Sequence, residues 1–318
     1  MAYTEIIYRS PVCIEHSIYY AGNYGAKGEK RKPKRKATPE QIEKQNRKNK
    51  ANRIRHLIQL NFSSDDYYLT LCYPAFYRPT LEEVERDFKS WIRKTRAEYK
   101  KHDEEFKYIY RLEMGKRGGI HAHIILNRCK GLDRNKLDIM WMDIIYKNHE
   151  SKTKKTGCIH WEMLHPHPEE QSPFDRLAEY MSKEPPDIPK YKDLAADEQK
   201  KIVKYGSSRN LIRPQLEKKK YNHWTVKKLL ELGAEGINQQ NRYKTPGYIV
   251  IKRSWQSGFN PVTGLSYIKF TEIRGHDFTH EKKDRGKPDN KSGNVKKKNR
   301  QFPRAGRPYG GKLSGVRL

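Results

Sequence analysis

A short segment with two histidines, residues 111–127 (RLEMGKRGGIHAHIILN), contains residue types that bind a divalent cation. Glu113 precedes the GKRGG turn, and His121 and His123 follow it, one residue apart in an apolar run. The alternating apolar and polar residues on both sides of the glycines predict a β-hairpin. Two imidazoles and one carboxylate from adjacent strands would converge on one cation and leave positions open for substrate oxygens.

The register of this hairpin decides whether the three side chains share a face. A turn centred on Arg117 places Glu113 opposite His121 and Arg111 opposite His123, and directly opposed residues lie on the same face. The other face would then carry the side chains that enter the core: Tyr110, Leu112, Ala122, Ile124 and Leu126.

Histidine pairs of this kind also occur by chance in a chain with 12 histidines. The alternative interpretation is therefore two polar residues on a half-exposed strand. A second pair, His165 and His167, lies beside prolines without a strand of its own, and we do not expect it to bind a metal ion. The carboxylate of Glu113 opposite the first pair favours a metal site there.

A tyrosine in the segment 172–185 (SPFDRLAEYMSKEP) is a candidate nucleophile. The spacing of the apolar residues predicts an amphipathic helix that ends before Pro185, with Tyr180 at the flank of its buried stripe. Arg176 and Lys183 would favour the phenolate, which is otherwise scarce because tyrosine titrates near pH ~10. Attack of this oxygen on a phosphodiester is then plausible chemistry. The alternative is an ordinary boundary tyrosine on such a helix.

The elements around these residues predict an α+β fold with a central antiparallel sheet and helices on one face. A β-branched and aromatic run at 67–74 indicates a strand, and helical spacing at 80–101 indicates a helix. The hairpin follows, then a helix at 132–143, a strand at 157–164 and the helix at 172–185. Thr38, Pro39 and Gln41 would begin an earlier helix that is basic on nearly all sides.

The composition indicates a nucleic-acid partner. Lys and Arg number 67 against 38 Asp and Glu, and the resulting formal net charge of +29 attracts polyanions. No apolar stretch approaches the roughly 20 residues of a spanning helix and no signal peptide opens the chain, so we expect a cytoplasmic protein without a membrane partner. The four cysteines lack C-x-x-C spacing, which predicts free thiols.

Three motifs resemble those of HUH endonucleases: YLTLCYP at 68–74, Glu113 with His121 and His123, and Tyr180 with Lys183. Their order is similar to that of a rolling-circle replication initiator from a small plasmid or single-stranded DNA virus. The resemblance covers roughly residues 60–185. It implies a ferredoxin-like or RRM-like sheet, Mg²⁺ or Mn²⁺ at Glu113, His121 and His123, and Tyr180 as nucleophile, with Lys183 positioning the metal or the scissile phosphate.

The resemblance also implies a metal-dependent site-specific endonuclease and strand transferase. Such an enzyme nicks and rejoins single-stranded or hairpin origin DNA through a 5′-phosphotyrosine. We expect DNA contacts from Arg111, Lys116, Arg117 and Arg176. The segment GRPYGGKL at 306–313 lacks the Ser or Thr of a P-loop, so unwinding would need a host helicase, and a host polymerase would extend the nick in the bacterial cytoplasm.

These observations divide the chain into four expected regions. They are an N-terminal segment with a basic arm and a helix (1–58), an endonuclease domain (59–186), an extension or small α/β subdomain (187–280) and a disordered basic tail (281–318). Within the third region we expect a short helix near 224–233 and strands at 247–255 and 265–273. The competing functional class is a non-catalytic single-stranded nucleic-acid-binding module with an RRM-like sheet, on which Tyr67, Tyr68, Tyr108 and Tyr110 stack on bases.

Overall fold

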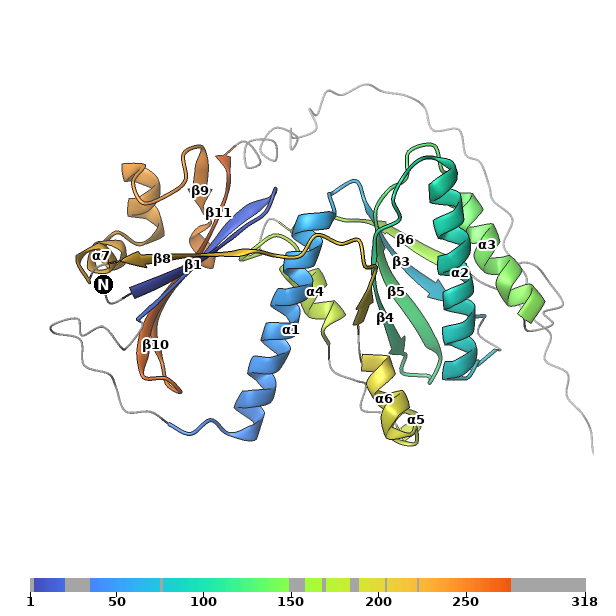
Figure 1. The fold of residues 1–318 in the computed structure, drawn as a ribbon. Coiled ribbons are helices and arrows are strands. Elements are labelled where there is room, and N and C mark those ends of the chain that lie inside the picture. The colour runs from blue at the N-terminus through green and yellow to red at the C-terminus, as the bar shows by residue number, and fades with distance from the viewer. Residues whose placement is uncertain are drawn as a thin grey trace, which may run out of the picture. The chain divides into compact units, whose positions relative to one another are not determined.

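The computed structural model describes residues 3–20, 35–74, 77–148, 158–167, 170–183, 189–203, 205–221 and 223–275 (Figure 1). The chain divides into two compact units, Met1–Phe278 and Thr279–Leu318, and the described residues all belong to the first. The predicted tail at 281–318 and the basic residues at 25–34 lie outside them. Within the described part of the chain, no helix is long and apolar enough to cross a membrane.

The first sheet carries the histidine hairpin. In the described residues its strand order is β6-β3-β5-β4-β7, and neighbouring strands are antiparallel. The chain builds it as β-α-β-β-α-β with a short edge strand added later, which is the ferredoxin-like topology. The elements are β3 (Tyr67–Cys72), α2 (Leu81–Lys101), β4 (Tyr108–Met114), β5 (Ile120–Leu126), α3 (Arg134–Asn148), β6 (Cys158–Met163) and β7 (Tyr205–Ser207). The α+β class predicted from the sequence is confirmed.

Helices α2 and α3 cover one face of this sheet and close its main core. Helix α2 begins at a capping box between Thr80 and Glu83, which satisfies backbone N–H groups at its first turn. Trp91 and Trp141 are almost fully buried between these helices and the sheet. Each indole finds a partner: Trp91 donates to the Leu137 carbonyl and Trp141 to the Cys72 carbonyl. The apolar face of the hairpin lies in this core, as predicted.

The opposite face of the sheet is also partly covered, which differs from the expectation of helices on one face only. Ile109 and Ile125 point to this side and need apolar neighbours. Helices α1 (Pro39–Asn61) and α4 (Asp175–Met181) supply them, with Ile54 and Phe174 in the same cluster. Helix α1 begins at the predicted Thr38 capping box, but its second half is buried rather than basic on all sides.

A second antiparallel sheet joins the beginning of the chain to its later part. Its path is β10-β11-β2-β1-β8, with β9 also paired to β11. The sequence analysis predicted strands near 248 and 265 but none in residues 3–20. The elements are β1 (Tyr3–Arg9), β2 (Cys13–Tyr20), β8 (Leu216–Tyr221), α7 (His223–Gln240), β9 (Tyr248–Val250), η1 (Lys252–Ser254), β10 (Gln256–Asn260) and β11 (Leu265–Arg274). Two short helices, α5 (Pro189–Lys192) and α6 (Ala196–Val203), precede β7.

A buried charged network ties the second sheet to α1 and α4. The guanidinium of Arg55 on α1 donates to Glu15 of β2 at 2.8 Å and pairs with Asp175, the first residue of α4. Glu15 also lies 3.0 Å from His56 Nε2 and accepts from Ser172 Oγ at 2.6 Å. Burial raises the pKa of Glu15, but the hydrogen bond with His56 and the charge of Arg55 outweigh it and lower the pKa to about 2. Cys13, Cys72 and Cys129 are free thiols, as predicted.

The network predicts an acid-sensitive component of stability. Because folding lowers the pKa of Glu15 from 4.5 to about 2, its ionised form stabilises the fold above pH 4.5, and this stabilisation is lost as the pH falls toward 2. Between about pH 6 and about pH 3 the unmodified protein should lose about 2 kcal/mol more unfolding free energy than Glu15→Gln. Urea unfolding at both pH values measures this difference.

The matched control is Glu217→Gln, which removes an exposed carboxylate paired with Arg9 on the same sheet. Its pH dependence should follow that of the unmodified protein. If Glu15→Gln also follows it, the network does not stabilise the fold in this way.

Candidate functional site

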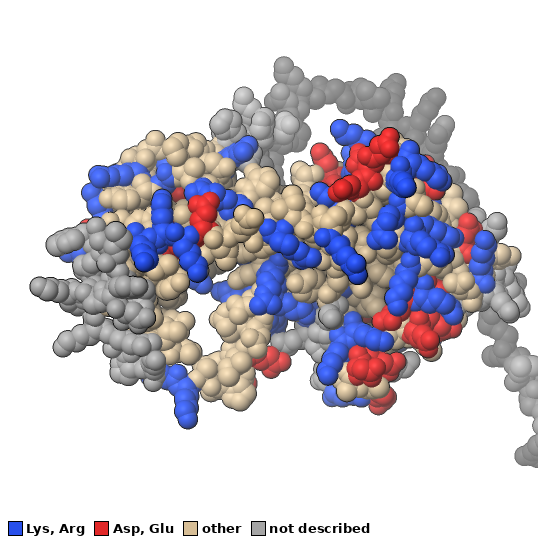
Figure 2. Space-filling view, in the orientation of Figure 1, with Lys and Arg blue, Asp and Glu red and all other residues tan. Residues whose placement is uncertain are grey.

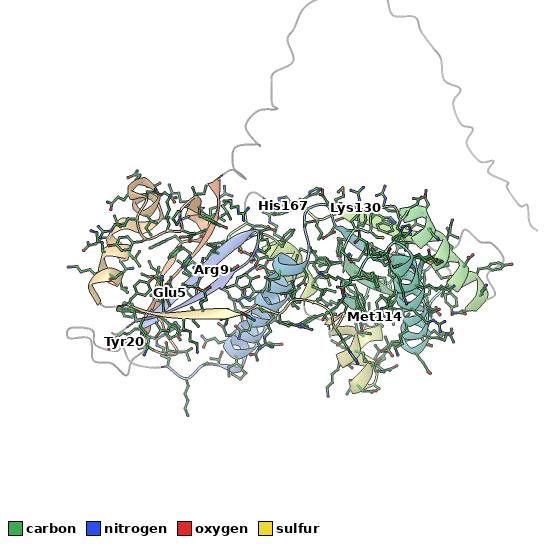
Figure 3. The ribbon with its side chains drawn as sticks, turned by 45° about the horizontal axis from the view of Figure 1, so that its top comes forward. Glu5, Arg9, Tyr20, Met114, Lys130 and His167 are labelled. Carbon is green, nitrogen blue, oxygen red and sulfur yellow. The ribbon has the colours of Figure 1, made fainter. Side chains whose placement is uncertain are left out.

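The β4–β5 hairpin has the predicted register. Glu113 is opposite His121, and Arg111 is opposite His123. The turn closes with hydrogen bonds from Gly115 N to the Gly119 carbonyl at 2.8 Å and from Gly118 N to the Gly115 carbonyl at 2.7 Å. In Figure 3, Met114 marks the end of β4, immediately after Glu113 in the chain. The hairpin therefore places all three candidate ligands on the face opposite α2.

Glu113, His121 and His123 form a cluster that fits a divalent cation. Each offers one ligand atom, and these atoms lie within 4.8 Å of one another. The Oε2 atom of Glu113 is 3.1 Å from Nε2 of His123. Among the described residues no other group of this kind is present, and His165 and His167 are not part of one. A set of two imidazole nitrogens and one carboxylate oxygen can hold a divalent metal and leave coordination positions open.

Two residues that the sequence analysis did not assign to the site orient His123. Tyr68 Oη lies 2.6 Å and Thr70 Oγ1 lies 3.1 Å from Nδ1 of this imidazole. Both come from β3, where Thr70 is directly opposite His123. With Nδ1 engaged, Nε2 is directed toward Glu113, and such outer partners fix the orientation of a ligating imidazole. The signal was present in the sequence as polar residues alternating along YYLTLC, but only the β3–β5 register shows their target.

Tyr180 reaches the same cluster from α4. Its hydroxyl lies 3.0 Å from His123 Nε2 and donates to Glu113 Oε2 at 3.2 Å. The side chain is 37% exposed, so solvent and substrate have access to it. Residues from β4, β5 and α4 thus meet at one point, although 57 positions separate Tyr180 from His123.

The pKa of Tyr180 does not follow the sequence-based expectation. Burial and the neighbouring carboxylate of Glu113 raise it to about 12, so the phenol stays protonated at neutral pH. Lys183 lies 5.8 Å from the ring centroid, too far to reverse the effect of a carboxylate in hydrogen-bond contact. The hydrogen bond with His123 lowers the pKa of Glu113 to about 2, and burial lowers the pKa of His121. Both groups are therefore in the form that binds a cation at neutral pH.

The expected DNA-contact residues fall into two groups. Arg176, Lys116 and Arg117 are exposed: Arg176 lines a groove with Tyr180, whereas Lys116 and Arg117 line one with His121. Arg111 differs, because it is only 1% exposed and donates to the Tyr180 carbonyl at 3.1 Å. It lies beneath the nucleophile instead of at the surface.

The histidines of the second pair also lie near the site. His165 and His167 are exposed and line the groove that contains Tyr180 and Arg176 (Figure 3 labels His167). Of the four sheet tyrosines, Tyr68 faces this groove. The other three pack against the core on the α2 side: Tyr67, Tyr108 and Tyr110.

Residues 66–185 match a family model whose description is that of a replication-associated protein of the ORF2 type. The matched segment begins just before β3 and ends after α4, so it contains the cation cluster and Tyr180. This part of the chain is therefore similar to a replication-associated family. No curated protein and no solved structure matches the chain.

Arg111 yields a prediction about stability. Its guanidinium has no carboxylate within ion-pair distance among the described residues, and its Nε and Nη2 atoms are buried without hydrogen-bond partners. Burying a charge without a close partner costs free energy, and an apolar side chain of similar size is often neutral or stabilising by about 1–4 kcal/mol. Arg111→Met should therefore unfold at an equal or higher urea concentration.

The companion variant is Arg55→Met, which removes a buried arginine that does have carboxylate partners. This variant should lose about 3–5 kcal/mol, because it leaves buried carboxylates uncompensated. A comparable loss in Arg111→Met would contradict the assignment of Arg111 as an unpaired charge.

Proposed function

We propose that the protein nicks and rejoins single-stranded DNA at a replication origin through Tyr180, as a rolling-circle initiator of the HUH type. The observation that carries this proposal is the position of the Tyr180 hydroxyl, which lies within 3.2 Å of the ligand atoms of His123 and Glu113. The replication-associated family match over 66–185 supports the same role. A tyrosine nucleophile adjacent to a cation cluster is suited to phosphodiester transfer.

Mg²⁺ or Mn²⁺ held by Glu113, His121 and His123 would polarise the scissile phosphate as a Lewis acid. The donor set fits such an ion, since two of its side chains have lowered pKa values and are available as ligands at neutral pH. Tyr68 and Thr70 keep the His123 ring in its orientation through Nδ1.

The chemical step exchanges one phosphate ester for another. A bond forms between Tyr180 Oη and phosphorus while the bond from phosphorus to the 3′-oxygen breaks, and that oxygen takes up a proton. The phenol proton leaves toward Glu113 Oε2, its acceptor at 3.2 Å, and then to solvent. Because the product is still a phosphate ester, attack by a 3′-hydroxyl reverses the step and rejoins the strand.

Arg111 and Lys183 assist this step from two sides of Tyr180. The buried charge of Arg111 lowers the cost of negative charge on the phenol oxygen. Lys183, exposed and 5.8 Å from the ring, is placed to meet the phosphate from the solvent side. Arg176, Lys116 and Arg117 hold the flanking DNA. A host helicase and a host polymerase complete replication in the cytoplasm.

The competing function, a non-catalytic module with an RRM-like sheet, has weaker support. It needs several tyrosines exposed on the open face of the sheet for stacking. In the structure Tyr67, Tyr108 and Tyr110 lie on the side that α2 covers, and Tyr68 is engaged with His123.

Tyr180→Phe should abolish the covalent protein–DNA adduct and leave DNA binding within about twofold, because only the nucleophilic oxygen is removed. The assay incubates the protein with labelled single-stranded origin DNA and Mn²⁺, and separates denatured adduct on a gel. Tyr19→Phe is the control, since Tyr19 has the same 37% exposure but lies on β2. An adduct that persists in Tyr180→Phe would assign the nucleophile to another residue.

Direct Mn²⁺ binding distinguishes the two histidine pairs. His121→Ala should weaken binding at least tenfold because it removes a ligand, whereas His165→Ala should leave binding unchanged because His165 lies outside the cluster. Electron paramagnetic resonance of free Mn²⁺ measures both affinities without DNA. Equal losses in the two variants would show that the ion binds elsewhere.

A further inference from the structure

A second groove lies on the other face of the first sheet, between α2 and the β4–β7 edge. Its lining includes the aromatic rings of Phe88, Tyr108, Tyr110 and Tyr205. Along β4, Tyr108 and Tyr110 point into this groove, while Arg111 and Glu113 point to the candidate active site. One strand therefore separates the two surfaces.

The rim of this groove is positively charged. Lys89, Arg93 and Arg96 are exposed and follow one side of α2, because their spacing of four and three residues is that of helical neighbours. Lys201 adds a fourth cation, and the lining contains one carboxylate, Glu85. Figure 2 shows Lys and Arg side chains gathered along α2.

Arg93 and Arg96 are the cations available to a ligand. Glu85 already pairs with Lys89 at 3.6 Å and with Lys201 at 3.8 Å. Among the described residues, no acidic side chain lies within ion-pair distance of either arginine. The local excess of positive charge is therefore not neutralised by the protein itself.

The aromatic floor is held in place by a close backbone contact. A Cβ atom at position 206 would lie 2.3 Å from the Tyr110 ring, so β7 can pair with β4 here only as glycine. The Tyr110 ring packs on Phe88 at a centroid distance of 4.5 Å and lies 6.1 Å from the Tyr108 ring. Both tyrosines remain partly exposed.

We propose that this groove binds single-stranded nucleic acid, at a site separate from the candidate active site. Surfaces of this class combine cations that follow the phosphates with aromatic rings on which bases stack. The row on α2 supplies the first, and Tyr108 and Tyr110 supply the second. Duplex DNA stacks its bases internally and would leave the aromatic floor unused. An acidic protein surface would pair with the arginines but would not account for the tyrosines.

The first test measures binding of a fluorescent oligothymidylate in EDTA, on a Tyr180→Phe background. Under these conditions neither metal nor covalent chemistry contributes. Removing two phosphate contacts with Arg93→Ser and Arg96→Ser should lower affinity roughly tenfold near 0.15 M salt, and should reduce the slope of log affinity against log salt by about 1.4. The control is the double variant Arg242→Ser and Arg253→Ser, two exposed arginines outside the first sheet.

The control should bind within about twofold of the background protein, because its arginines lie outside the groove. If both double variants lose affinity equally, the effect is one of general charge and the proposal is overturned. An unchanged affinity in the Arg93 and Arg96 variant also overturns it.

The second test maps the contact with an oligonucleotide that carries a photoreactive iodouracil. Trypsin releases residues 108–111 as one peptide, because Lys107 precedes it and Arg111 ends it. This peptide contains both tyrosines of the groove, whereas the active-site residues His121, His123 and Tyr180 fall in other peptides. Crosslinks to residues 108–111 support the proposal, and crosslinks confined to the other peptides overturn it. Neither test depends on strand cleavage, so loss of the covalent adduct would bear on the proposed function alone.

Discussion

The candidate site depends on the register between β4 and β5. A slip of one residue would turn His121 and His123 to the α2 side and bring Ala122 and Ile124 to the site. The packing of Leu112, Ala122 and Ile124 against α2 opposes such a slip, because it would expose them and bury the imidazoles. The hydrophobic core therefore sets the positions of the cation ligands as firmly as any contact among the ligands themselves.

Electrostatics at the site follow from burial. Glu113 is held ionised by His123, yet the same carboxylate raises the pKa of Tyr180. Arg111 opposes that rise from beneath, with a charge that has no close carboxylate partner among the described residues. Such an arrangement costs stability, and an uncompensated buried cation next to a nucleophile has a use when negative charge arrives. The protonated phenol is then a resting state that a bound phosphate and metal would change.

Local patterns were sufficient to predict the parts of the fold that depend on near neighbours. The Thr38 capping box, the hairpin register and the amphipathic helix around Tyr180 all involve residues within a few turns of one another. Two features escaped because they depend on distant partners. Strand β1 pairs with β8 about two hundred residues later, and Arg111 is buried because α4 folds over it. Neither relation leaves a periodic trace in the sequence.

The pairing of the earliest strands with the latest ones has a consequence for synthesis of the chain. A two-stranded hairpin is marginal in water, so β1 and β2 gain lasting order only when β8 and β11 have emerged from the ribosome. Glu15 on β2 then secures Arg55, and Arg55 secures Asp175 at the beginning of the helix that carries Tyr180. The nascent chain thus completes the support of its nucleophile among its last folding events, which keeps unfinished chains from acting on DNA.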